Sequence, residues 1–178
     1  MSLTTFLQES FAAEARDGWQ SFSERKVLEP ELAKELGFSP RVDLLLEHDS
    51  LGKRIWIEFE VSRADPAANH LKYTVGHLFS PNLSKDIFLS MVSNHVTRGR
   101  ANLGATTVML MRRLGICAFQ TPLLPRIPAT KIRELNHLTE NELQSQGINV
   151  GEEIQRAVTV TKPAYSVKGD EVYYAGNH

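Results

Sequence analysis

Three acidic residues occur at spacings that could bring their carboxyl groups to one point. Asp43 precedes Glu58 and Glu60 by fifteen and seventeen residues. Carboxylates that converge repel one another, so protons, a basic side chain or a divalent cation must neutralise them. Oxygen ligands of this kind suit Mg²⁺ or Mn²⁺. A cation bound there could polarise a phosphodiester and lower the pKa of a bound water, which is the chemistry of metal-dependent hydrolysis.

The segments that carry these acids are typical of two β-strands joined by a turn. Residues 41–48 and 54–61 are rich in apolar side chains, and a glycine-containing turn signal separates them. In the second strand, Glu58 and Glu60 alternate with apolar residues, so both glutamates lie on one face. An antiparallel hairpin would bring Asp43 across the ladder from them, where opposed side chains lie about 5 Å apart.

A simpler interpretation of the acids stays open. Carboxylates on one side of a strand often form only its solvated face, and Glu47 shows that this hairpin also carries an acid without an evident role. Strand interiors nevertheless disfavour Asp and Glu, so three of them in one hairpin call for an explanation.

Further helices and strands are predicted on both sides of the hairpin. Late strands that alternate with helices imply parallel crossovers, whereas the hairpin is antiparallel. We therefore predict an α/β fold with a mixed β-sheet flanked by helices on both faces. The predicted elements are helices over 3–23, 65–79 and 98–114 and strands over 41–48, 54–61, 85–93 and 116–124.

Beyond residue 125, a proline-rich segment marks an exit from this core. We divide the chain into a core, residues 1–125, and a C-terminal extension, residues 126–178, that packs on the core. The elements predicted in the extension are helices over 131–147 and 151–160 and a β-hairpin over 164–174.

Length and composition suit a single core with a modest extension. The chain has 178 residues, of which 42% are hydrophobic and 23% charged, and its net charge is −1. A near-neutral chain is not a polybasic binder, although it can carry a local basic cleft. Cys117 has no second cysteine to pair with, and its apolar surroundings predict a buried core thiol. Because no signal peptide or membrane-spanning run is evident, we expect a cytoplasmic protein.

The residues Pro40 and Asp43, a hairpin, and then Glu58-Phe59-Glu60 resemble the signature of the PD-(D/E)XK superfamily of restriction-endonuclease-like domains. The order of the surrounding elements is also similar to the common core of that superfamily. This resemblance implies a restriction-endonuclease-like core in which Asp43 and Glu58 bind Mg²⁺ or Mn²⁺. The backbone carbonyl of Phe59 would be a further ligand.

The sequence departs from the superfamily pattern at two points. Two residues separate Pro40 from Asp43, so the usual adjacent pair is split. Glu60 also stands where most members carry a lysine that orients or deprotonates the attacking water. Some restriction enzymes of the superfamily carry glutamate at this position, and the resemblance then implies that Glu60 is a metal ligand or a general base.

Five further residues are candidates for such a site. Lys72 and Arg63 could replace the missing lysine, and Glu14 could join the metal ligands, as glutamates of the first helix do in some members. Arg98 and Arg100 open the helix predicted over 98–114. Positive charge at a helix start opposes the helix dipole, so we predict that this pair contacts phosphate groups.

The resemblance implies a magnesium-dependent endonuclease that hydrolyses DNA phosphodiester bonds. A homodimer would follow if it cuts both strands of a palindromic duplex. The alternative is a catalytically degenerate member that acts as a DNA-binding or protein-interaction module, which the missing lysine favours. A third hypothesis is an α/β domain whose acids are only a solvated strand face.

Overall fold

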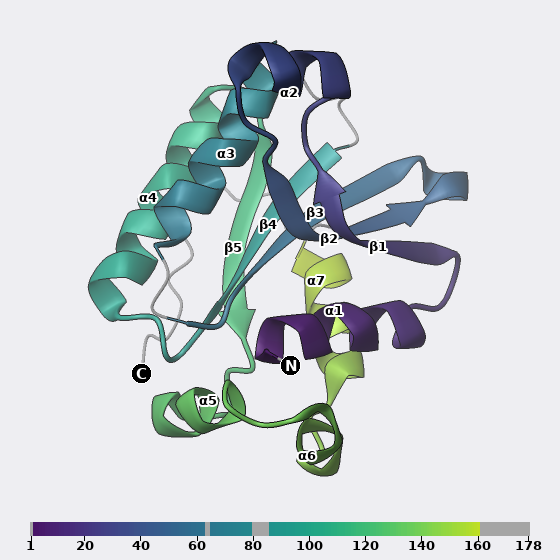
Figure 1. Cartoon of the computed structure of the whole chain (residues 1–178), viewed down its shortest axis with the longest axis vertical. Helices are drawn as coiled ribbons and strands as arrows, with labels where there is room; N and C mark the ends of the chain where they lie inside the picture. Colours follow the sequence, from purple (N-terminus) through teal and green to yellow (C-terminus); the bar gives the residue numbers. More distant parts are fainter. Residues whose placement is uncertain (1, 63–64, 80–85, 161–178) are drawn as a thin grey trace.

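The computed structural model describes residues 2–62, 65–79 and 86–160 of the chain (Figure 1). Within these ranges, α-helices and β-strands follow one another in a mixed order. The helices are α1 (Leu3–Glu14), α2 (Pro30–Leu36), α3 (Pro66–Phe79), α4 (Arg98–Arg113), α5 (Ala129–Leu135), α6 (Glu140–Ser145) and α7 (Val150–Val160). The strands are β1 (Trp19–Lys26), β2 (Arg41–His48), β3 (Lys53–Glu60), β4 (Asp86–Ser93) and β5 (Cys117–Leu123), and a 3₁₀ turn covers Asp49–Leu51.

The described strands form one mixed sheet in the order β1-β2-β3-β4-β5. β1, β2 and β3 are antiparallel neighbours, whereas β3, β4 and β5 run parallel. The parallel strands are connected through α3 and α4, because a strand can rejoin its parallel neighbour only by a crossover. The predicted α/β class and mixed sheet are therefore confirmed.

Helices cover both faces of the sheet, as predicted (Figure 1). On one face, Leu44 and Ile57 pack in a core that includes Phe11 of α1. On the other face, Trp56 and its neighbours pack against Tyr73 of α3 and residues of α4. Strand side chains alternate between the faces, so each core takes every second residue.

The prediction of a single helix over 3–23 is wrong. α1 ends at Glu14, and after a turn the chain enters β1, which pairs along β2 at the edge of the sheet. Asp17 and Gly18 have φ values of 59° and 86°, in the left-handed region that a right-handed helix cannot continue. As a result Phe22, expected on the apolar face of a helix, is 37% exposed on an edge strand.

The C-terminal extension also differs in detail from the prediction. The single helix predicted over 131–147 is two helices, α5 and α6, separated where Thr139 and Glu142 form a capping box at the start of α6. The helix predicted over 151–160 is present as α7. Buried side chains of all three helices join the same core as α1, and the hairpin predicted over 164–174 lies outside the described residues.

Cys117 is exposed, so the expectation of a buried thiol is wrong. It is the first residue of β5, at the free edge of the sheet, where neighbours do not enclose it. None of the helices in the described ranges combines the length and the apolar character that crossing a bilayer requires.

Candidate active site

Asp43 and Glu58 meet where the ladder between β2 and β3 ends. The last backbone pair at this end of the ladder is Leu44 with Ile57. Beyond it, the Oδ2 atom of Asp43 accepts a hydrogen bond from the backbone N–H of Phe59 at 2.7 Å. The Asp43 side chain thus replaces a backbone contact between the strands, and its carboxyl group is hydrogen bonded to that of Glu58.

These two acids begin a row of polar side chains that crosses the sheet beneath α3 and α4. Glu58 pairs with Ser90 in β4, and Ser90 pairs with Gln120 in β5. All three are buried, and the Ser90 hydroxyl has no hydrogen-bond partner among the described residues. A buried unpartnered hydroxyl calls for a specific explanation, and a site that receives a polar ligand provides one.

The pKa values of the three acids are all raised. Burial is the main cause for each: it raises the pKa of Asp43 to about 6, that of Glu58 to about 10 and that of Glu60 to about 7. For Glu58, the negative charges of Asp43 and Glu60 add to the effect of burial. In the metal-free protein near neutral pH, Glu58 is therefore protonated and donates a hydrogen bond to Asp43.

Lys72 and Asn69 bring polar groups from α3 to the same site. The Nδ2 atom of Asn69 donates to Oε1 of Glu60 at 2.9 Å, and its Oδ1 atom accepts from Nζ of Lys72 at 3.0 Å. The positive charge of Lys72 lowers the pKa of each of the three acids, opposing the effect of burial. Of the two basic residues that the sequence suggested, Lys72 therefore lies beside the carboxyl groups.

Gln8 approaches the site from the opposite side, on α1. Its Nε2 atom donates to the backbone carbonyl of Asp43 at 2.8 Å and to Oε1 of Glu24 at 3.0 Å. Glu24 has a φ of 51°, and its charge contributes to the raised pKa of Asp43. Gln8 thereby connects α1 to β1 and β2 at the position where Asp43 leaves the ladder.

The sequence analysis missed both Asn69 and Gln8. Asn69 precedes Lys72 by three residues, which puts the two on one face of a helix. Because Lys72 was already a candidate site residue, this spacing could have indicated that Asn69 faces the same site. Gln8 carried a weaker signal, a polar residue beside Leu7 on the buried face of α1.

Among the residues that the structure describes, Glu14, Arg98 and Arg100 make no hydrogen bond or ion pair with the three acids. Glu14 is exposed at the end of α1, and its Oε2 atom would lie 3.6 Å from a Cβ added at Gly151 in α7. Arg98 and Arg100 are exposed in the first turn of α4, which follows the carboxyl end of β4. Arg63 lies outside the described residues.

The donor chemistry of the site suits a hard divalent cation, although its present contacts do not form a complete coordination sphere. Within residues 2–62, 65–79 and 86–160, no three acidic, imidazole or thiol groups are arranged to hold one metal ion. Asp43 and Glu58 hydrogen bond to each other, while Glu60 accepts from Asn69. Loss of the Glu58 proton would leave two adjacent carboxylates as oxygen ligands, with Glu60 on the same face.

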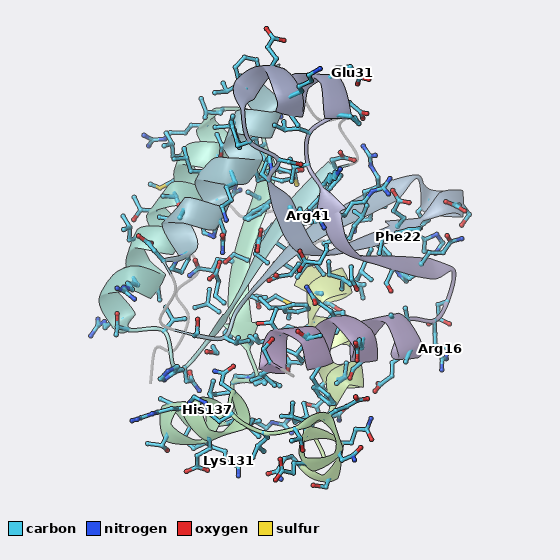
Figure 2. The ribbon with its side chains drawn as sticks, in the orientation of Figure 1. Arg16, Phe22, Glu31, Arg41, Lys131 and His137 are labelled. Atoms are coloured by element: carbon cyan, nitrogen blue, oxygen red, sulfur yellow. The ribbon has the colours of Figure 1, made fainter. Side chains whose placement is uncertain are left out.

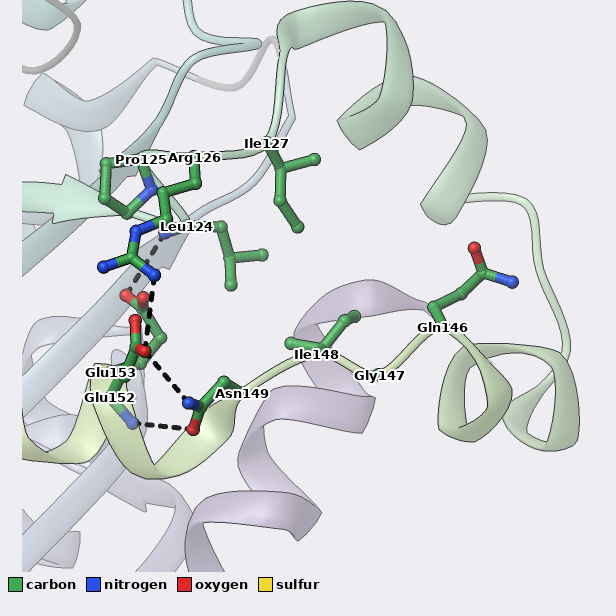
Figure 3. Close-up of a pocket in the computed structure, with 10 residues that line it drawn as sticks. All are labelled: Leu124, Pro125, Arg126, Ile127, Gln146, Gly147, Ile148, Asn149, Glu152 and Glu153. Carbon is green, nitrogen blue, oxygen red and sulfur yellow. Dashed lines mark hydrogen bonds and ion pairs between the residues drawn. The ribbon is translucent and has the colours of Figure 1, made fainter.

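A hollow of about 370 Å³ lies elsewhere, between the end of β5 and the start of α7 (Figure 3). The buried carboxylate of Glu153 accepts a hydrogen bond there from the backbone N–H of Leu124 at 3.1 Å. Arg126 forms an ion pair with Glu152 across the hollow at 3.5 Å. These contacts attach α7 to β5, so we interpret the hollow as part of the packing of the extension.

No family model, curated protein or solved structure matches this chain. Fold alone does not specify activity, so a function has to be argued from the chemistry of the site.

Proposed function

We propose that this protein is a divalent-metal-dependent nuclease that hydrolyses DNA phosphodiester bonds on a restriction-endonuclease-like core in the cytoplasm. One observation carries the proposal: Asp43, Glu58 and Glu60 share one face of two adjacent strands, and the pKa of each is raised. Strongly perturbed acids that face one another concentrate at functional sites. A bound cation would relieve their repulsion and attract an anionic phosphodiester.

Each residue has a distinct role in this proposal. Asp43 and Glu58 would hold Mg²⁺ or Mn²⁺, which when bound supplies positive charge and activates water. Glu60 would accept the proton of the attacking water or complete the ligand set, and its pKa of about 7 suits a base that works near neutral pH. Lys72 would place its ammonium group against the phosphate oxygens, as the missing strand lysine would have done.

A second candidate is a degenerate member of the same fold that binds nucleic acid without cleaving it. The observation in its favour is the hydrogen bond between the Asp43 and Glu58 carboxyl groups, which a metal ion would have to displace. Glu60 at the position of the usual lysine supports it further. This candidate predicts binding of DNA that is unaffected by divalent cations and is not followed by cleavage.

A cleavage assay separates the two candidates. Purified protein is incubated with Mg²⁺ or Mn²⁺ and one of three substrates: supercoiled plasmid, circular single-stranded DNA or single-stranded RNA. Wild type is compared with Asp43→Ala and Glu58→Ala, and Glu47→Ala serves as the matched control because Glu47 lies on β2 outside the carboxyl cluster. We expect wild type and Glu47→Ala to cleave, and the other variants to lose at least about 100-fold in rate.

The assay also contains the result that would overturn the proposal. Cleavage that survives Asp43→Ala would locate the activity elsewhere, and absence of cleavage by wild type on every substrate with both metals would refute the nuclease function. A shift of DNA mobility without cleavage would support the binding module.

A homodimer is part of the proposal only for cleavage of a palindromic duplex. The outer sides of α3 and α4 expose large apolar side chains that could be buried between two copies. They include Leu71, Leu78, Leu110 and Leu114. Light scattering on the purified protein measures the mass directly, and a monomer at micromolar concentration would argue against this mode of cutting.

A further inference from the structure

A hollow of about 400 Å³ lies between the end of β1 and α2. Its lining includes one aromatic side chain, Phe38, which is 41% exposed, and two lysines, Lys26 and Lys34. An exposed aromatic ring offers a flat apolar surface on which a planar group can stack. An aromatic ring bordered by two ammonium groups is suited to a ligand that is both planar and anionic.

The charges around this hollow are available for a ligand. Within the described part of the chain, neither the side chain of Lys26 nor that of Lys34 takes part in a hydrogen bond or an ion pair. Glu31 and Glu35 lie on α2 as well, but neither of them lines the hollow. Arg41 adds a third cation, because it pairs with Lys26 in the ladder between β1 and β2.

The hollow adjoins the proposed active site. Arg41 is two residues before Asp43 on β2, a separation of roughly 7 Å along a strand. On the other side of Asp43, Phe22 pairs with Leu45. The guanidinium of Arg25 lies over the Phe22 ring, 5.8 Å from its centroid.

Two aromatic rings, each accompanied by positive charge, thus flank Asp43: Phe22 on β1, and Phe38 just after α2 in the hollow at the end of β1. Figure 2 shows Phe22 and Arg41 on these two neighbouring strands. This arrangement follows a line, which is the shape that an extended polymer would occupy.

We propose that β1 and α2 bind single-stranded nucleic acid, with Phe38 and Phe22 stacking on bases that flank the phosphate at Asp43. The proposal rests on the nuclease function and names its substrate class. Aromatic rings stack on any unpaired base, while lysines along the groove follow the phosphates. In a duplex the faces of the bases are covered by their neighbours, so a flat ring has no surface to contact.

Fluorescence anisotropy tests the proposal without any need for cleavage. A labelled single-stranded oligonucleotide and the duplex of the same sequence are titrated in EDTA with wild type, Phe38→Ala and Phe22→Ala. Phe79→Ala is the matched control, since Phe79 is also an exposed phenylalanine but lies at the end of α3. We expect wild type to prefer the single strand, and each of Phe38→Ala and Phe22→Ala to weaken that binding at least about fivefold while Phe79→Ala changes nothing.

The lysines are tested by the salt dependence of the same binding. Replacing Lys26 and Lys34 together with alanine should reduce the slope of log affinity against log salt by about 1 to 2, because up to two phosphate contacts are lost. Lys131→Ala, on α5, should leave the slope unchanged. Circular dichroism melting confirms that each variant is folded.

Two results would overturn the proposal: wild type that binds the duplex as tightly as the single strand, or Phe38→Ala that binds the single strand like wild type. Both are distinguishable from failure of the nuclease function. Single-strand binding that depends on Phe38, without cleavage in any metal, would leave this inference standing and refute the nuclease. Cleavage that depends on Asp43, with normal single-strand binding by Phe38→Ala, would support the nuclease function and refute this inference.

Discussion

The carboxylate of Asp43 accepts the backbone N–H of Phe59 at 2.7 Å, and this contact determines where the neighbouring acids lie. The bond holds the Asp43 side chain at Phe59 of β3. Glu58 and Glu60 are the residues before and after Phe59, and their side chains point to the same face of the strand. The bond also lowers the pKa of Asp43 against the larger effect of burial. Of the adjacent pair, Asp43 therefore ionises first and Glu58 keeps the proton.

Replacing Glu58 with glutamine should stabilise the metal-free protein at alkaline pH. In the unfolded chain Glu58 ionises near 4.5, whereas the folded protein holds this proton up to about pH 10. The folded state binds more protons between these values, so its stability falls as the pH rises through them. We expect Glu58→Gln to raise the free energy of unfolding at about pH 8 by about 2 to 4 kcal/mol, measured by urea denaturation.

The control for this measurement is Glu47→Gln, which changes an acid of the same hairpin outside the cluster. It should leave the pH dependence of stability as in wild type. Equal pH dependence in wild type and Glu58→Gln would show that Glu58 does not carry the buried proton.

Binding of Mn²⁺ should stabilise the folded protein and release a proton. The ion requires ionised ligands, and Glu58 is protonated below its pKa of about 10. At a cation concentration of 100 times Kd the gain in stability is about 2.7 kcal/mol. Calorimetry at neutral pH in two buffers of different ionisation enthalpy should report about one proton released per ion. The same melting shift in Asp43→Asn would place the ion at another site.

Removal of Lys72 should impair cleavage and move its pH profile. The charge of Lys72 lowers the pKa of Glu60, so in Lys72→Ala the base ionises only at higher pH. We expect the acidic limb of the rate profile to move upward and the maximal rate to fall by roughly 10- to 100-fold. Lys72 is exposed, so stability should change by less than about 0.5 kcal/mol.

Two variants distinguish a role in catalysis from a loss of charge in general. Lys72→Arg keeps the charge and should restore the position of the acidic limb. Lys131→Ala removes a lysine from α5 and should leave rate and profile as in wild type. An unchanged profile in Lys72→Ala would exclude it from the site.

Gln8 should matter for stability as well as for the geometry of the site. Gln8→Leu keeps the volume of the side chain but removes the donor that serves the Asp43 carbonyl and Glu24. An acceptor left buried and unsatisfied costs about 1 to 3 kcal/mol. Thermal melting should show this loss, whereas Gln144→Leu on the exposed side of α6 should change little. Equal melting temperatures of Gln8→Leu and wild type would contradict a stabilising role for the Gln8 hydrogen bonds.

Local patterns were sufficient to predict the strands around the site. The strand predicted over 41–48 matches β2, and that over 54–61 matches β3 within one residue at each end, because period-two alternation is specific to strands. β1 was not predictable in this way. Residues 19–26 are mostly exposed, and they form a strand because β2 presents an unpaired edge to them.

The sequence by itself determined which acids could act together, since alternation along β3 puts Glu58 and Glu60 on one face whatever surrounds them. Only the tertiary structure decided their chemistry. The raised pKa values result mainly from burial in the packed structure, and the compensating groups come from α3, where Lys72 lowers the pKa of all three acids and Asn69 lowers that of Glu60. Burial and charge proximity depend on how the helices pack on the sheet, and no local spacing encodes that packing.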